Sequence, residues 1–207
     1  MRYYMLNKPR GCITACSDAR HKTVMDLISP DEREGLFPIG RLDRDTEGFL
    51  ILTDDGALCN ALNSPKNRKD KTYRFYAKGE WSPEAGERLN SGVNIPPLGS
   101  RLTAPARSAL LGRATMRDIA DLFPPEERVR LLHTRAGDVP LVHVELTVTE
   151  GKKHQVKRMA AAVGLTVVYL ERVAICGVPL DPDLKRGEYR PLTEDEINTL
   201  KSLSLRK

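Results

Sequence analysis

The sequence predicts an α+β fold with a mixed, mostly antiparallel sheet. Strand-like and helix-like segments alternate irregularly along the 207 residues, whereas a doubly wound parallel fold would alternate them regularly. Several strand-like segments also have one apolar and one polar face, which is typical of antiparallel sheets that face water on one side. With 40% apolar and 29% charged residues, the composition is that of an ordinary globular protein.

The first half of the chain alternates three predicted strands with short helical segments. The strands are expected over 2–7, 48–53 and 71–77, and the helical segments over 23–28, 58–62 and 83–91. Pro9 ends the first strand. Thr23 is the predicted N-cap of the first helical segment, with Asp26 three residues later, as in a capping box. In the third strand, Tyr73 and Phe75 fall on the same face.

One strand and one helix in the second half have the clearest periodicity. Residues 141–148 alternate between apolar and polar side chains, so this strand should have one buried face. Gly151 then turns the chain into a helix over 153–163. The apolar stripe of this helix consists of Val156, Met159, Ala160 and Val163. The polar residues Lys153, His154, Lys157 and Arg158 lie off that stripe.

Three further segments complete the predicted order of elements. Residues 110–123 have partial helical periodicity, and Pro124 should end that helix. Residues 166–173 are typical of a strand. The last helix should begin at Thr193, because Thr193 and Glu196 have the spacing of a capping box.

The charge balance is compatible with a polyanionic partner. The chain has 33 Lys and Arg against 28 Asp and Glu, which gives a net charge of +5. Basic residues gather between 66 and 78 with aromatic residues among them. No apolar run is long enough to span a membrane, and the first residues lack the pattern of a signal peptide. We therefore expect a cytoplasmic protein that does not bind membranes.

The cysteines do not predict a metal site. Cys12, Cys16, Cys59 and Cys176 include no C-x-x-C pair. Cys12 and Cys16, followed by His21, have a loose metal-like spacing that lacks a nearby fourth ligand. We expect reduced thiols and no bound metal.

The candidate catalytic segment is Gly40-Arg41-Leu42-Asp43-Arg44-Asp45-Thr46-Glu47-Gly48, directly before the apolar run 49–53. Glycines at both ends allow the backbone to turn, and the apolar run reads as a buried strand that would anchor the loop. A carboxylate would thus be presented on a rigid support with an arginine on either side.

Four interpretations of Asp43 and Asp45 follow from the residues alone. A D-x-D phosphatase or metal motif would normally follow an apolar strand, whereas Gly40 and Arg41 precede here. A calcium loop fits part of the spacing but has Asp54 at its last ligand position. The third interpretation is a single catalytic aspartate with arginines that position the substrate. The fourth is a solvated, charged turn without a function.

The chain resembles the RsuA/RluB/E/F family of ribosomal RNA pseudouridine synthases. Gly40-Arg41-Leu42-Asp43 with Thr46 and Gly48 matches the family's catalytic motif, and Lys71-Thr72-Tyr73 matches its K-x-Y motif. The other matching blocks are Leu6–Gly11 with Thr23–Leu27, Glu150–Met159, Leu170 with Arg172, Leu180 with Asp181, and Gly187–Thr193. The resemblance covers nearly the whole chain except about 108–138.

The resemblance implies roles for individual residues. Asp43 is the catalytic aspartate, Tyr73 the active-site tyrosine that packs on the target base, and Lys157 the basic partner of the carboxylate. Leu170 lines the uracil pocket, and Arg41 fills space left by the flipped base. Further substrate contacts are expected from Arg158, Lys71, His154 and Lys8. No cofactor is implied.

The resemblance also implies an architecture and a substrate. We expect one catalytic domain over 1–207 with approximate lobes 1–60 and 61–207, an active-site cleft between them, and no N-terminal S4 domain. The expected partner of this monomer is ribosomal RNA or a ribosomal subunit precursor, with small-subunit RNA favoured over large-subunit RNA. Two other functions stay open: a ribosome-assembly factor that binds RNA without turnover, and a metal-dependent phosphohydrolase.

Overall fold

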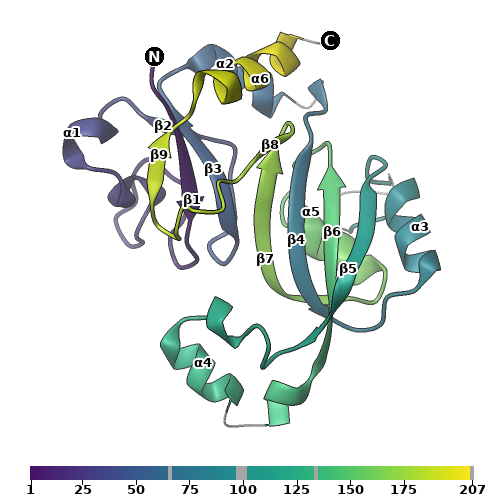
Figure 1. Cartoon of the computed structure of the whole chain (residues 1–207). Helices are drawn as coiled ribbons and strands as arrows, with labels where there is room; N and C mark the ends of the chain where they lie inside the picture. The colour runs from purple at the N-terminus through teal and green to yellow at the C-terminus, as the bar shows by residue number, and fades with distance from the viewer. Residues whose placement is uncertain (65–66, 97–101, 133–134, 206–207) are drawn as a thin grey trace. The chain divides into compact units, whose positions relative to one another are not determined.

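The computed structural model describes residues 1–64, 67–96, 102–132 and 135–205 (Figure 1). The chain groups into two compact units that are interleaved in sequence. Unit 1 contains Met1–Thr72, Thr149–Gly151 and Glu171–Lys207, and unit 2 contains Tyr73–Val148 and Lys152–Leu170. Among the described residues, no helix is long and apolar enough to cross a membrane.

Unit 1 is a small mixed sheet with helices. Its central strand β1 (Tyr3–Lys8) lies antiparallel to both β3 (Glu47–Thr53) and β9 (Tyr189–Pro191). The short strand β2 (Phe37–Ile39) is antiparallel to β3, whereas β7 (Thr166–Ile175) pairs with the start of β3 in parallel. A two-residue strand, β8 (Val178–Pro179), pairs with the end of β7. The predicted mixed, mostly antiparallel sheet is thus confirmed.

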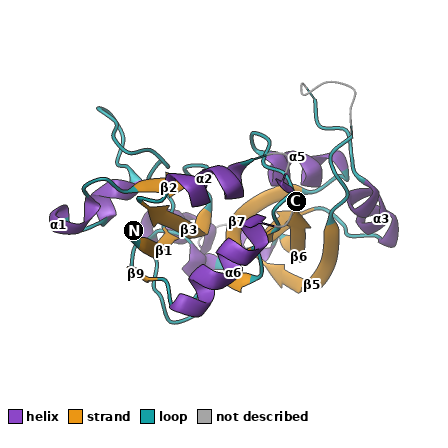
Figure 2. Ribbon diagram, turned by 90° about the horizontal axis from the view of Figure 1, so that it is seen from above, coloured by secondary structure: helices purple, strands orange, loops and turns teal. Residues whose placement is uncertain are grey.

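Helices cover the apolar side chains of unit 1. Leu58 and Leu62 of α2 (Gly56–Asn63) and Leu200 of α6 (Glu194–Leu205) join a cluster with Met5, Phe49 and Ile51 of the sheet. Both helices are drawn in Figure 2. The smaller helical elements are α1 (Pro30–Arg33) and a 3₁₀ turn over Val24–Leu27. Burial of this cluster gives a fixed support to the loop that leaves β1 and to the loop that enters β3.

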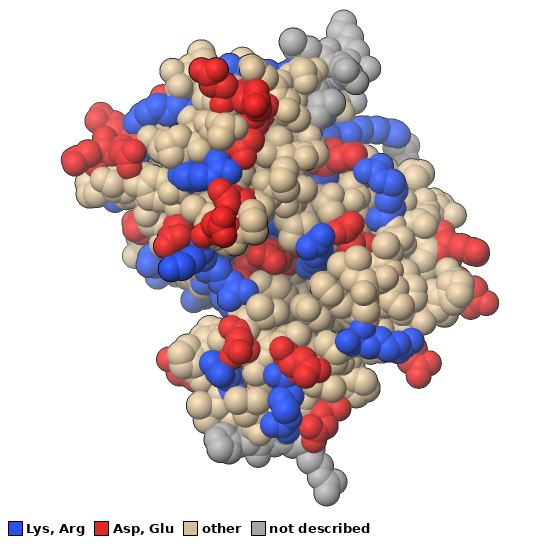
Figure 3. Space-filling view, viewed as in Figure 1, with Lys and Arg blue, Asp and Glu red and all other residues tan. Residues whose placement is uncertain are grey.

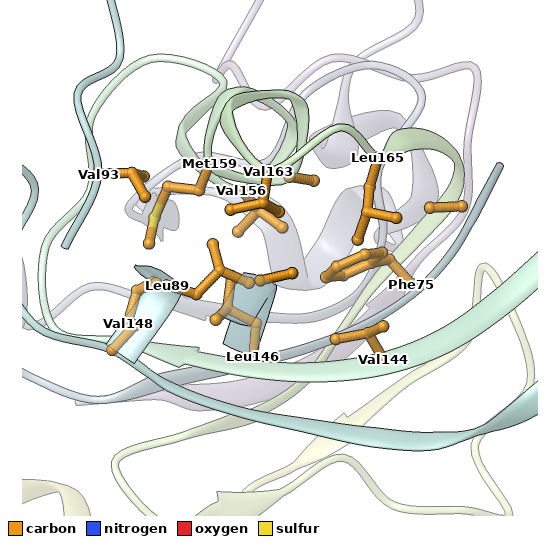
Figure 4. Close-up of a cluster of buried hydrophobic side chains, with 14 of the residues drawn as sticks. Phe75, Leu89, Val93, Val144, Leu146, Val148, Val156, Met159, Val163 and Leu165 are labelled. Carbon is orange, nitrogen blue, oxygen red and sulfur yellow. The ribbon is translucent and has the colours of Figure 1, made fainter. Parts of the chain in front are cut away.

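Unit 2 contains a four-stranded sheet in the order β5-β6-β4-β7. Its further strands are β4 (Lys71–Lys78), β5 (Arg107–Thr115) and β6 (Pro140–Val148). α5 (Gln155–Ala162) packs on one face, together with α3 (Pro83–Ser91). In Figure 4, Val144, Leu146 and Val148 of β6 point toward the stripe of α5, as the alternation and the helical period predict.

Several sequence signals for helix ends are confirmed. Thr23 and Asp26 form the predicted capping box, although the segment is a 3₁₀ turn. Thr193 and Glu196 form a second box before α6. The predicted helix over 83–91 is confirmed as Pro83–Ser91 and is followed by Gly92 at a φ of 95°.

The predicted helix over 110–123 is wrong. Residues Arg107–Thr115 form β5, which pairs antiparallel with β6 and has an irregularity between Leu110 and Gly112. The bulge and the exposed face of this edge strand disturb the two-residue alternation, so the leucines imitate a helical period. The prolines also begin a helix, α4 (Pro125–Leu132), because proline is tolerated in the first turn.

Candidate active site

The loop that carries Asp43 joins β2 to β3 within unit 1. Gly40 opens it with a φ of 72°, a left-handed conformation that suits glycine. Leu42 is buried, and the hydroxyl of Thr14 bridges its backbone: this oxygen accepts from the Leu42 N–H at 3.1 Å and donates to its carbonyl at 2.9 Å. The residue before Asp43 is therefore fixed, while Asp43 itself is only half-buried.

A buried lysine fastens the rest of the loop. Lys8 has no exposed surface, and its ammonium donates to the carbonyls of Asp43 at 3.1 Å and Thr46 at 2.9 Å. The carbonyls of Pro9 at 3.0 Å and Arg44 at 3.5 Å complete its surroundings. Burial lowers the pKa of Lys8, and the neighbouring Cys12 thiol and loop carboxylates oppose this shift.

The backbone also ties the loop to the segment that follows β1. The Gly11 N–H donates to the carbonyl of Arg44 at 2.8 Å, and Nε of Arg44 donates back to the carbonyl of Gly11 at 3.1 Å. Together with the Lys8 bonds and the Thr14 bridge to Leu42, these contacts hold the main chain on both sides of Asp43. Such support reduces the reorganisation that a reacting carboxylate would otherwise require.

The end of the loop passes into β3 through Glu47 and Gly48. The carboxylate of Glu47 is buried and forms an ion pair with Arg186. Gly48 has a φ of 97°, and a Cβ there would lie 2.3 Å from the carbonyl oxygen of Arg172 in β7. Arg172 is buried too and donates from Nε to the carbonyl of Phe49 at 2.8 Å. Only glycine fits where β3 and β7 approach this closely.

The second group of predicted site residues lies in unit 2. Tyr73 on β4 is half-buried and packs against the cluster that contains Leu170 of β7 and Val156 of α5. Tyr73 and Phe75 thus contact the same core cluster, as predicted. Lys157 is half-buried on α5, off the apolar stripe. Tyr73, Leu170 and the helix that carries Lys157 therefore share one side of this sheet.

The residue before α5 has a left-handed backbone conformation, and basic residues lie on both sides of it. His154 is exposed and precedes the helix at a φ of 51°, in the left-handed region. Gln155 is buried, and its side-chain oxygen accepts from the Lys152 N–H at 2.8 Å. The half-buried Arg158 donates weakly to the Lys153 carbonyl at 3.5 Å. The helix start is thereby held while its basic side chains stay at least partly exposed.

The other predicted contact residues are placed as follows. Arg41 is exposed beside Asp43 in unit 1. Lys71 belongs to unit 1 as well and donates to the carbonyl of Lys69 at 3.1 Å. Burial lowers the pKa of Lys71, and the charge of Arg172 adds to this effect. Lys8 is buried among main-chain carbonyls, a position that fits a role in supporting the loop.

The sequence analysis did not single out Thr14, Arg172 or Arg186 as supports of the loop. Arg172 lies in a matched block, and its position two residues after Leu170 in a predicted strand was the only signal. Thr14 and Arg186 had none, since each acts through a contact far from its own place in the sequence. Within the described residues, no three His, Cys, Asp or Glu gather as metal ligands would.

Comparisons with known proteins identify the family. Residues 2–162 match the family model described as RNA pseudouridylate synthase. The chain is 43% identical over 199 residues to the Bacillus subtilis (strain 168) protein called "Uncharacterized RNA pseudouridine synthase YtzG", covering 96% of this chain and 72% of the relative. The chain therefore belongs to the RNA pseudouridylate synthase family, and the resemblance drawn from its motifs is confirmed.

Two other comparisons agree with this result. The chain is 37% identical over 196 residues to "Ribosomal small subunit pseudouridine synthase A" of Escherichia coli (strain K12), covering 95% of this chain and 72% of the relative. A solved structure entitled "Crystal structure of pseudouridylate synthase" matches with a TM-score of 0.78 at 34% identity, covering 96% of this chain and 73% of that one. The expected pseudouridine synthase fold is confirmed.

Proposed function

We propose that this enzyme converts a uridine of small-subunit ribosomal RNA to pseudouridine, with Asp43 as its catalytic carboxylate. The observation that carries the proposal is the Asp43 loop, where the family's motif coincides with a half-buried carboxylate on a firmly held backbone. The choice of small-subunit RNA is supported by the name of the Escherichia coli relative and by the block Glu150–Met159.

The proposal gives each of the predicted site residues a role. Asp43 begins the cleavage of the N-glycosidic bond, after which the uracil turns and is rejoined to the ribose through carbon. Lys157, which matches the family's late motif, is proposed as the basic partner of this carboxylate. Tyr73 would pack on the base and take part in removing its C5 proton. Leu170 would form the apolar wall beside the uracil.

The target uridine must leave its stack before it can react. Flipping a base out costs a few kcal/mol, and a side chain that enters the gap offsets part of this cost. Arg41, exposed beside Asp43, is proposed for this role. Basic side chains at Lys71, His154 and Arg158 would hold phosphates, which provides affinity but little sequence choice. The reaction transfers neither electrons nor phosphoryl groups, so the proposal includes no cofactor. We propose that the protein acts as a monomer.

The test is tritium release from ribosomal RNA transcribed with 5-tritiated uridine, because the isomerisation exchanges the C5 hydrogen. Small-subunit and large-subunit RNA are assayed separately, each as naked RNA and as assembled particles. Release from small-subunit substrates supports the proposal. Release only from large-subunit substrates would overturn the choice of RNA. Binding without release from any substrate would favour an assembly factor, and phosphate hydrolysis that a chelator abolishes, without tritium release, would favour a metal-dependent hydrolase.

A further inference from the structure

Aromatic rings from three neighbouring strands adjoin one another within unit 2. The rings of Tyr76 on β4 and His143 on β6 are stacked, with centroids 4.2 Å apart and planes 10° from parallel. The buried Tyr169 on β7 adjoins Tyr76 on its other side, with the centroids 6.3 Å apart and the ring planes tilted by 53°. We call Tyr169, Tyr76 and His143 the aromatic ladder. It runs across the sheet, from β7 through β4 to β6.

The ladder lies on the face opposite α5. Phe75 and Ala77 of β4, and Val142 and Val144 of β6, belong to the core under α5, so the alternating residues Tyr76 and His143 point the other way. Figure 1 places α5 behind this sheet, and Figure 3 shows the surface over β5 and β6 in the same view as largely uncharged. Tyr76 and His143 are both partly exposed.

Beyond His143, the aromatic ladder has no further ring on β5, because the residue opposite His143 is a glycine. The next strand, β5, is the last in the sheet, and its Gly112 lies directly opposite His143. A Cβ built at Gly112 would meet no atom within 4 Å, and the backbone there is not left-handed, so the strand itself does not require glycine. Ala109 and Ala114, which share this face of β5, are small as well. The outer side of His143 thus adjoins open space above β5.

Basic side chains lie on the same face of the sheet as this open space. Arg74, two residues before Tyr76 on β4, donates from Nε to the carboxylate of Glu145 at 2.9 Å. Its guanidinium is half exposed, so its terminal nitrogens can meet a phosphate. Arg107 and Lys78 are exposed on the same face. Glu145 is the acidic residue that β6 contributes there, and it is paired with Arg74.

We propose that the aromatic ladder binds an unpaired nucleotide of the substrate RNA, whose base stacks on the outer side of His143 above Gly112. The ligand class rests on the proposed function, which makes RNA the substrate. A flat base would extend the stacked pair of Tyr76 and His143 into the space that Gly112 leaves, while the arginines on this face hold the phosphates. A peptide would offer neither a flat base for the open side of His143 nor phosphates for Arg74 and Arg107.

The charge of His143 fits stacking better than phosphate binding. Burial lowers the pKa of His143, and the charge of Arg74 lowers it further, whereas Glu145 opposes the shift. The imidazole is therefore mostly neutral at pH 7 and presents a ring face rather than a cation. Direct base stacking is tolerant of sequence, so this contact would add grip to RNA without selecting the modified uridine.

The experiment measures binding separately from catalysis. Each ladder variant is made in the Asp43→Ala protein, and the dissociation constant is measured for a short single-stranded RNA that carries 2-aminopurine, whose fluorescence falls on stacking. A blunt duplex RNA of the same sequence is the comparison. Because no turnover is needed, failure of the ladder and failure of the proposed function are distinguished.

Three substitutions and one control substitution define the result. His143→Ala should weaken binding of the single strand at least about five-fold, which is the lower end for one stacked base, and should abolish the fluorescence change. His143→Phe should restore both. Gly112→Leu should weaken binding by filling the space, while Leu111→Ser, at the neighbouring exposed bulge position, should not. Thermal melting confirms that each variant is folded.

Wild-type affinity in both His143→Ala and Gly112→Leu would overturn the proposal. Failure of His143→Phe to restore binding would also overturn it, because a ring would then not be the essential feature. An equal loss for duplex and single strand would show that the face binds phosphates only, which contradicts base stacking.

Discussion

The ammonium of Lys8 lies 2.9 Å from the carbonyl oxygen of Thr46 and 3.1 Å from that of Asp43. One buried cation thus holds the main chain at and beyond the proposed catalytic residue. Because Lys8 belongs to the central strand of unit 1, the geometry of the loop depends on the stability of the sheet.

Lys8→Met should therefore destabilise the protein. The substitution removes the donor and leaves several buried carbonyls without it, at a cost of about 1–3 kcal/mol in the free energy of unfolding. Urea denaturation followed by circular dichroism measures the change. Lys78→Met, at an exposed position on β4, is the control and should change stability by less than about 0.5 kcal/mol. Equal denaturation midpoints for Lys8→Met and wild type would contradict this role.

The ion pair between Glu47 and Arg186 should couple the end of the Asp43 loop to the segment before β9. The Glu47 carboxylate is buried, whereas the Arg186 side chain is partly exposed. A double-mutant cycle with Glu47→Gln and Arg186→Gln should give a coupling energy of about 1–3 kcal/mol. This range lies between the values for exposed and for buried ion pairs. Substitution of the neighbouring exposed Lys185 supplies the control, and additive effects of Glu47→Gln and Arg186→Gln would rule out the coupling.

Gly48→Ala should be among the most damaging small substitutions. The new Cβ would meet the Arg172 carbonyl at 2.3 Å, and the φ of 97° is strained for alanine. We expect a loss of about 3 kcal/mol or more in unfolding free energy, measured by thermal and urea denaturation. In contrast, a Cβ at Gly56 meets nothing within 4 Å, so Gly56→Ala should be neutral or slightly stabilising. Similar losses at both positions would refute the steric explanation.

Stability should depend on pH through the capping box of α6. Hydrogen bonds from Arg190 hold the pKa of Glu196 below 4.5, and burial opposes this shift. An acid with a depressed folded pKa stabilises the protein fully above its unfolded pKa, and the contribution disappears as the pH falls through the folded value. Glu196→Gln should cost about 1 kcal/mol at pH 7.

That difference should shrink as the pH falls below the unfolded pKa, where the unfolded chain takes up a proton that the folded carboxylate resists, and it should vanish only below the depressed folded pKa. Unfolding curves of wild type and Glu196→Gln at a series of pH values measure it. A difference that stays constant down to pH 3 would mean that the ion pair is not its cause.

The sequence predicted the parts of the fold that depend on strong local periodicity. The alternation in β6 and the apolar stripe of α5 were clear because each element buries a single face against the other. β5 was missed because it is a bulged edge strand with exposed leucines, so burial does not impose an alternating pattern.

The motif also located the Asp43 loop but not its supports. Lys8 reads as a surface cation in the sequence, and its burial follows from the position of β1 between β3 and β9, a long-range pairing without a local signal. The aromatic ladder has the same origin, because Tyr76, His143 and Tyr169 become neighbours only through the strand order of unit 2.

The most direct test of the central claim compares two aspartates of one loop. Asp43→Ala and Asp45→Ala are assayed for tritium release from 5-tritiated small-subunit RNA, with RNA affinity and thermal stability measured alongside. The account predicts no release above background for Asp43→Ala at normal RNA affinity, and release of the same order as wild type for Asp45→Ala. Retained release by a folded Asp43→Ala protein would contradict the assignment of Asp43 as the catalytic carboxylate.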